Sequence, residues 1–139
     1  MSPKFKLDNK VAVISGGTGI LGSTIALSFV KSKVKVVILG RNEKKIISTV
    51  EKLKKDGGDV IGFVCDVVSK KSLKNVSHEI LKKFRKIDIL LNAAGGNSPG
   101  ASIGNNQYIF DVSMDEFAKV SEINLNGSVL PSLVFGEIM

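Results

Sequence analysis

The sequence lacks tryptophan and has one cysteine, one histidine and one tyrosine among its 139 residues. The single cysteine, Cys65, excludes a disulfide within the chain and fits a reducing compartment, so we expect a cytoplasmic protein. One cysteine and one histidine are too few soft ligands for a zinc site, and we expect no metal. No apolar run approaches the ~20 residues of a membrane-spanning helix. The basic start is not followed by the apolar core of a signal peptide, so we expect no membrane association.

Acidic residues are also in short supply, at 13 against 20 lysines and arginines, which leaves a net charge of +7. The lysines are spread through helix-like segments and mixed with acidic residues, without interleaved aromatic residues that could stack on bases. We therefore expect a solvated basic surface and no nucleic-acid partner. Hydrophobic residues make up 43% of the chain, which is enough to form the core of one compact domain over residues 1–139.

Short apolar runs alternate with segments of helical periodicity along most of the chain. Runs that are apolar on both faces are typical of parallel strands covered by helices. The order βαβαβαβ, followed by a loop over 95–112 and a helix, predicts the α/β class. We expect a doubly wound parallel (Rossmann) sheet with strand order 3-2-1-4, present as its N-terminal portion only. The expected strands are 11–14, 34–39, 60–65 and 87–91, and the expected helices are 19–31, 42–55, 69–84 and 113–138.

The stretch "SGGTGILG" joins the first expected strand to the first expected helix. Glycine at this turn lets the backbone approach a ligand closely, and the helix start offers free N–H groups to a phosphate. A phosphoryl-transfer loop would need a lysine here, and a methyltransferase usually has an acidic residue leading into the turn; neither is present. The alternative is a tight turn with incidental glycines. We predict a dinucleotide site formed by Ser15, Gly16, Gly17, Thr18, Gly19, Ile20, Leu21 and Gly22.

The second expected strand ends in "LGRN", where a dinucleotide site usually has an acid for the ribose 2′-hydroxyl. Gly40 stands at that position and Arg41 follows it. A guanidinium suits a 2′-phosphate, so Arg41, with Asn42, favours NADP(H) over NAD(H). The alternative is a solvated charge paired with Glu43.

Three further segments follow in order: "VCDV", "LNAAG" and "EINLNG". Together with the glycine turn they resemble the short-chain dehydrogenase/reductase family, with Ser15 in place of its threonine and Ala93 in place of its second asparagine. The resemblance implies an NAD(P)-dependent oxidoreductase that transfers a hydride. It also implies cofactor contacts from Asp66, Val67, Asn92, Ala93, Ala94 and Gly95, and a catalytic role for Asn124.

The loop "AGGNSPGAS" and the helix "LNGSVLPSLVFG" resemble the D-mannonate oxidoreductase (fructuronate reductase) subgroup of that family. This narrower resemblance implies a sugar acid such as fructuronate or mannonate as substrate, held beside Gly96, Asn97 and Ser98. Two alternatives stay open: a nucleotide-sugar epimerase or dehydratase of the extended type, and a non-catalytic dinucleotide-binding module.

The family's serine and its Tyr-x-x-x-Lys pair have no counterpart before Met139; Tyr108 is followed by Val112 at the lysine spacing. We therefore expect a C-terminally incomplete domain that is inactive alone, with the fourth strand as an exposed edge. Pro131 lies within the last expected helix and predicts a kink near 124–127. We expect much of that helix's apolar face to be bare, which predicts a homo-oligomer formed through this helix, or poor solubility of the chain. The face comprises Val129, Leu130, Leu133, Val134, Phe135 and Ile138.

Overall fold

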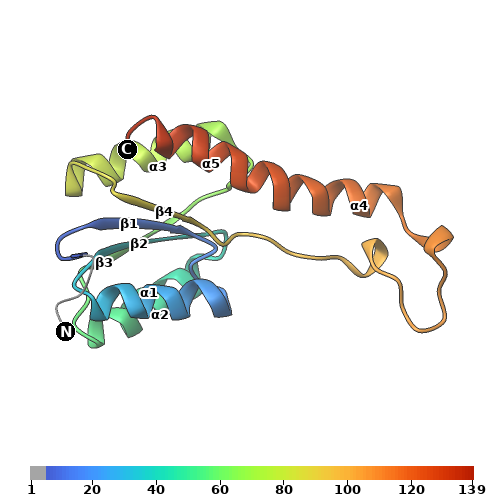
Figure 1. The fold of residues 1–139 in the computed structure, drawn as a ribbon, viewed down its shortest axis with the longest axis horizontal. Coiled ribbons are helices and arrows are strands. Elements are labelled where there is room, and N and C mark those ends of the chain that lie inside the picture. The colour runs from blue at the N-terminus through green and yellow to red at the C-terminus, as the bar shows by residue number, and fades with distance from the viewer. Residues whose placement is uncertain (1–5) are drawn as a thin grey trace.

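The computed structural model describes residues 6–139 and contains the predicted alternation of strands and helices (Figure 1). The strands are β1 (Val11–Ser15), β2 (Lys35–Gly40), β3 (Val60–Val64) and β4 (Ile89–Asn92). The helices are α1 (Ile20–Lys31), α2 (Glu43–Lys55), α3 (Lys70–Phe84), α4 (Met114–Ser121) and α5 (Gly127–Gly136). Within residues 6–139, no helix is both long and apolar enough to cross a membrane.

The four strands form one sheet in the order β3-β2-β1-β4, and each neighbouring pair is parallel. Ile14 of β1 lies opposite Ile38 of β2 and Leu91 of β4, so the carboxyl ends of these three strands are aligned. The predicted fold class and strand order are confirmed. β4 forms one edge of the sheet, as predicted.

Helices cover both faces of the sheet: α1 and α2 lie on one face, and α3 and α5 on the other (Figure 1). Each interface contains its own buried cluster, because successive side chains of a strand point to opposite faces. Ala12 and Ile14 of β1 pack with α1, whereas Val11 and Val13 pack with α3 and α5. The strands are therefore apolar on both faces for a structural reason, and the turns at their ends are held by a rigid core.

The last predicted helix consists of three pieces. α4 continues through a π-helical turn, η3 (Glu122–Asn126), into α5, which contains the buried Pro131. Gly127 donates its N–H to the carbonyl of Glu122, five residues earlier. The disturbance predicted near 124–127 thus takes the form of one wider helical turn, a feature frequently found at functional sites.

Two of the six apolar residues expected on the bare face of the last helix are exposed, and the other four are partly or fully buried. Phe135 is fully buried and Val134 nearly so, and both belong to the cluster beneath α3. Leu130 and Ile138 pack against the same cluster and are partly buried. Only Val129 and Leu133 of the predicted face are exposed, because α5 docks against β4 and α3 and directs its other apolar side chains inward.

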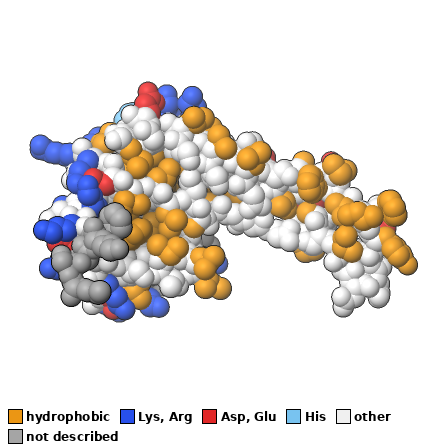
Figure 2. All heavy atoms as spheres, viewed as in Figure 1, with side chains coloured by type: hydrophobic (Ala, Val, Ile, Leu, Met, Phe, Trp, Pro, Cys, Tyr) orange, Lys and Arg blue, Asp and Glu red, His pale blue; other side chains and the backbone are white. Residues whose placement is uncertain are grey.

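An arm projects from the body of the molecule between β4 and α5 (Figure 1). The chain leaves the sheet after β4, passes through two short 3₁₀ turns, η1 (Pro99–Ala101) and η2 (Ile109–Asp111), and returns along α4. Hydrophobic side chains gather at the far end of this arm in Figure 2. They include Tyr108, Ile109, Phe110 and Met114, all of which are exposed. The long loop predicted over 95–112 is the outward half of the arm.

Candidate functional site

The glycine turn lies at the carboxyl ends of β1 and β4. Gly16 has a φ of +64°, and a β-carbon built on it would lie 2.5 Å from the carbonyl oxygen of Ala93. An L side chain is therefore excluded both by its backbone angle and by the neighbouring chain. Gly17 donates its N–H to the carbonyl of Leu39 at 3.1 Å, which joins the turn to β2. The turn is thus held against three strands.

The N-terminus of α1 has no side-chain cap. Gly19 stands at the N-cap, and the first turn has no acidic residue. By contrast, α2, α3 and α4 are capped by the side chains of Asn42, Ser69 and Ser113. The bond from Ser23 to Gly19 begins the α1 ladder, so the N–H groups of residues 20–22 have no acceptor within the helix. This helix end favours an anion through its free N–H groups and its dipole.

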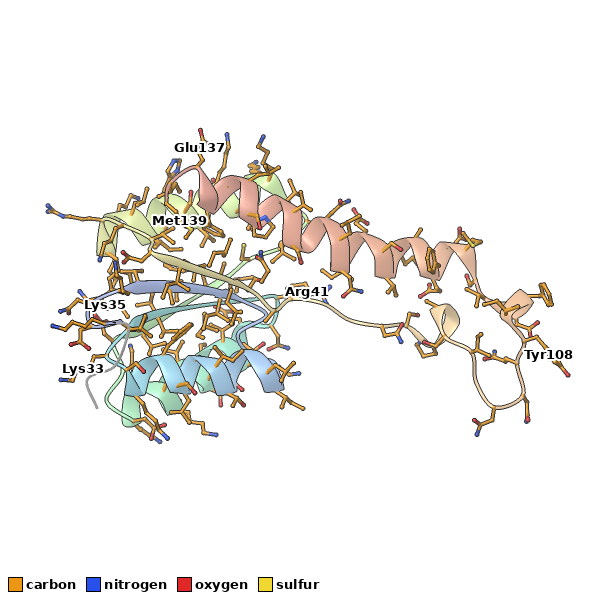
Figure 3. All side chains as sticks on the ribbon, viewed as in Figure 1. Lys33, Lys35, Arg41, Tyr108, Glu137 and Met139 are labelled. Atoms are coloured by element: carbon orange, nitrogen blue, oxygen red, sulfur yellow. The ribbon has the colours of Figure 1, made fainter. Side chains whose placement is uncertain are left out.

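A hollow of ≈ 310 Å³ opens in front of the turn. It lies at the carboxyl edge of the sheet, the position at which open α/β sheets bind their ligands. Seven predicted residues line it: Gly16, Thr18, Gly19, Arg41, Val67, Ala94 and Gly95. Arg41 lies beside the point where the arm leaves the body (Figure 3). The predicted cofactor residues from four separate segments therefore meet at one place.

Sequence reasoning missed three residues that also line this hollow: Lys45, Cys65 and Ile123. Lys45 could have been found, because it lies four residues after Arg41, in the first turn of the predicted second helix. Cys65 is buried, which raises the pKa of its thiol, so it is a poor nucleophile at neutral pH. Among residues 6–139, no aspartate or glutamate lines the hollow.

The remaining predicted cofactor residues lie outside the lining of the hollow. Ser15 is buried, and its hydroxyl accepts the N–H of Ala94 at 3.3 Å. Asn42 caps α2 by accepting the N–H of Lys45 at 3.0 Å. The carboxylate of Asp66 accepts the N–H of Val68 at 3.2 Å, which begins the turn into α3. Gly17 and Gly22 are buried, Ala93 is half-buried, and Ile20 and Leu21 are exposed at the start of α1.

Asn92 joins β4 to α5. Its Nδ2 donates to the hydroxyl of Ser132 at 2.9 Å and to the carbonyl of Ser128 at 3.3 Å. Its Oδ1 is buried without a partner among residues 6–139. Asn92 thus holds the end of β4 against α5, and its side chain does not line the hollow.

Asn124 lies in the π-helical turn and faces the loop that leaves β4. Its Oδ1 accepts the N–H of Gly96 at 3.2 Å, and its Nδ2 donates to the carbonyl of the same residue at 2.8 Å. Nδ2 also donates to the carbonyl of Val120. Asn124 therefore holds the backbone of the loop at the edge of the hollow.

The side chains of Asn97 and Ser98 are bonded within the arm. Asn97 donates to the hydroxyl of Ser102 at 2.7 Å, and the Ser98 hydroxyl donates to the Glu116 carboxylate at 2.5 Å. The ammonium of Lys119 and this hydroxyl lower the pKa of Glu116. The loop is thus joined to the helix by the side chains of Asn124 and Glu116, and by the N–H of Ser113, which donates to the carbonyl of Gly100 at 2.9 Å.

A sequence model described as short chain dehydrogenase matches residues 10–139. The chain belongs to this family. The uncharacterized oxidoreductase UxuB of Bacillus subtilis is 35% identical over 139 residues, which cover 94% of this chain and 50% of that protein. Tropinone reductase-like 3 of Erythroxylum coca is 34% identical and is matched over 90% of this chain and 46% of its own length. The chain thus spans about half the length of the curated relatives it matches.

Solved structures of the family have the same fold. A Haemophilus protein provisionally assigned as a D-mannonate oxidoreductase, with NAD bound, superposes with a TM-score of 0.87 at 27% identity. That match covers 95% of this chain and 51% of the other. An NAD⁺-bound xylitol dehydrogenase gives a TM-score of 0.88 at 26% identity, covering 97% and 50%. The family predicted from the sequence is confirmed.

Proposed function

We propose that this chain is the dinucleotide-binding part of an NAD(P)-dependent oxidoreductase. The observation that carries the proposal is the uncapped N-terminus of α1 beside a turn where Gly16 has a positive φ. The residues fit a pyrophosphate: three first-turn N–H groups lack helical acceptors, and no first-turn acid repels an anion. A bound nicotinamide cofactor would supply the hydride chemistry. The residues predicted from the sequence to contact the cofactor, from Ser15 of the glycine turn to Gly95 after β4, would form this dinucleotide site.

We further propose a preference for NADP(H) over NAD(H). Gly40, Arg41 and Lys45 lie together at the end of β2, and two of them carry a positive charge. A 2′-phosphate would be bound by a guanidinium and an ammonium, and no lining carboxylate among residues 6–139 would repel it. The two related structures described above contain NAD, and each is about a quarter identical in sequence to this chain.

For the chemical step, we propose that Asn124 acts by holding the loop at Gly96. Gly96 has open space where a side chain would stand, so the loop backbone is accessible there. A sugar acid such as fructuronate or mannonate is the proposed substrate, beside Gly96, Asn97 and Ser98. Because the side chains of Asn97 and Ser98 are bonded within the arm, backbone groups are the more accessible partners for its hydroxyls. We expect cofactor binding without turnover by this chain alone, since Tyr108 has no lysine four residues later.

We also propose that the chain forms a homo-oligomer through its last helix. Leu125 of the π-helical turn is exposed and precedes the exposed Val129 and Leu133 of α5 in steps of four residues. Met114 and Phe117 of α4 are also exposed. Steps of three or four residues place such side chains on one side of a helix, and a long exposed apolar line is typical of an interface. The chain's single cysteine supports a reducing, cytoplasmic location for this assembly.

Titration with reduced cofactors, followed by nicotinamide fluorescence, tests the cofactor proposal. NADPH should bind more tightly than NADH. The double substitution Arg41→Ala with Lys45→Ala should weaken NADPH binding at least about tenfold, because each charged hydrogen bond contributes about 1.5–3 kcal/mol. NADH binding should change little. Equal affinity for both cofactors before and after the substitutions would contradict the preference, and no binding of either by folded protein would contradict the site.

A further inference from the structure

The outer edge of β3 has unpaired backbone groups. Val36 of β2 donates its N–H to the carbonyl of Asp59, and Cys65 donates its N–H to the carbonyl of Gly40. In a parallel ladder, alternate residues face the same neighbour, so residues 59, 61, 63 and 65 face β2. The N–H and carbonyl groups of Val60, Gly62 and Val64 therefore point away from the sheet. Val60 is fully buried, so the accessible outward groups are those of Gly62 and Val64. β3 is the terminal strand on this side among the described residues.

A groove follows this edge between α2 and α3. It is shallow, has a volume of ≈ 510 Å³, and has Ile61, Gly62 and Phe63 of β3 as its floor. Val50 adds an apolar side chain from α2. Gly62 has no side chain to cover the strand edge, and its own β-carbon position is occupied by side chains of α2. The groove thus combines free backbone groups with apolar surface on both sides of the sheet.

The rim of the groove is positively charged. Lys54 comes from α2, and Lys82 and Lys83 come from α3; all three are exposed. The single carboxylate of the lining, Glu79, is already paired with Lys82 at 2.6 Å. A second copy of this chain would bring an identical lysine rim against this one, and like charges facing each other across paired strands are destabilising. Self-pairing at β3 is therefore disfavoured.

We propose that this groove binds an acidic, extended peptide segment of another protein, which adds to β3 as a further strand. Main-chain hydrogen bonds to Gly62 and Val64, the accessible residues of this edge, would hold the segment. Because successive side chains of the added strand point to opposite faces, each face would need one acidic and one apolar side chain. On the α2 face they would meet Lys54 and Val50, and on the α3 face Lys83 and Phe63. The groove contains none of the residues that line the cofactor hollow, so the proposal is independent of cofactor binding.

The probe is a fluorescein-labelled peptide of eight residues that repeats Glu-Glu-Val-Val, which presents both residue types to each face of a strand. The matched Lys-Lys-Val-Val peptide is the control. Fluorescence anisotropy with the folded chain at low salt should show saturable binding of the acidic peptide only. Val64→Pro removes one outward N–H without affecting the β2 ladder and should weaken binding about tenfold. Val64→Ala keeps that N–H and should bind within about twofold of wild type.

Charge reversal gives a test that does not depend on the proline. Lys54→Glu with Lys83→Glu, both at exposed positions, should abolish binding of the acidic peptide and create binding of the basic one. Circular dichroism confirms that each variant is folded. Absence of saturable binding, equal binding of both peptides, or affinity unchanged by Val64→Pro would overturn the proposal. The lysines would then serve only to keep other strands away from the edge.

Discussion

The side-chain amide of Asn124 is hydrogen-bonded at both ends to one residue, Gly96. Asn124 Oδ1 also lies directly beside Gly95. A β-carbon added to Gly95 would be 2.5 Å from that oxygen. The loop after β4 can approach the π-helical turn because Gly95 has no side chain at this contact. Two adjacent glycines therefore have different roles: Gly95 permits the approach, and Gly96 accepts and donates the bonds.

Gly95→Ala should displace Asn124 and release the loop. The methyl group would collide with Asn124 Oδ1, and overpacking of this kind costs about 1–3 kcal/mol. Hydrogen exchange at the Gly96 amide should accelerate by one to two orders of magnitude, in line with that cost. Gly96→Ala is the matched control, since nothing lies within 4 Å of its β-carbon position. Equal exchange rates in the two variants would contradict the proposed contact.

Phe135→Ala should destabilise the chain strongly. Phe135 belongs to α5 and its side chain is fully buried against the sheet and α3. Truncation of such a side chain costs about 3–5 kcal/mol. Ile47→Ala on α2, outside the proposed oligomer interface, should change the free energy of unfolding by no more than about 0.5 kcal/mol, because Ile47 is 51% exposed. Urea denaturation of both variants measures the difference. Similar midpoints for the two would show that α5 is not docked on the sheet.

Acid should destabilise the fold through Asp88. Burial opposes ionisation of this carboxyl, but Lys86, the N–H of Val11 and Lys10 lower its pKa to about 2. The folded pKa is therefore below the unfolded value, and the stabilisation is present at neutral pH and is lost as pH falls from about 4 towards 2. It amounts to about 2 kcal/mol. Asp88→Asn should remove it at pH 7 and flatten this part of the stability profile.

The control for that experiment is Asp8→Asn, at an exposed position before β1. This variant should keep the stability and the acid dependence of the wild type. If Asp88→Asn has the same pH profile as wild type, the ion pairs with Lys10 and Lys86 do not stabilise the folded state.

Negative charge at the exposed apolar positions of the last helix, Leu125 and Leu133, should dissociate the proposed oligomer. Leu125 and Leu133 are 64% and 63% exposed, so replacing both with glutamate leaves the buried core intact. Sedimentation should show an oligomer for wild type and a monomer for Leu125→Glu with Leu133→Glu. Ile47→Glu, at a similarly exposed position on α2, should leave the assembly unchanged. A wild-type chain that sediments as a stable monomer would contradict the interface.

Much of the fold could be predicted because its signals are local. Apolar runs bounded by glycine and polar residues located the four strands, and the helix caps Asn42, Ser69 and Ser113 lie next to the helices they begin. The strand order follows from right-handed crossovers between parallel strands. The position of the glycine turn could be predicted because the fold requires glycine there: Gly16 has a positive φ and lies in close contact with Ala93.

The features that were missed depend on contacts between distant residues. Phe135 is buried because α5 docks on β4 and α3, and helical periodicity does not say which partner covers which face. The bond from Ser98 to Glu116 joins residues 18 apart, and the bond from Asn92 to Ser132 joins residues 40 apart. Pro131 predicted a disturbance in the helix, but not the π-helical turn that brings Asn124 to Gly96.

The most direct test of the central claim is an amide proton–nitrogen NMR spectrum of the chain recorded during titration with NADP⁺. The largest chemical-shift changes should fall on the amides of Gly16, Gly19, Ile20, Leu21 and Gly95. The chemical shifts of the amides of β3 and α3 should not change. A folded chain in which those turn amides do not move, or in which the shifts fall on other segments, would contradict a dinucleotide site at the start of α1.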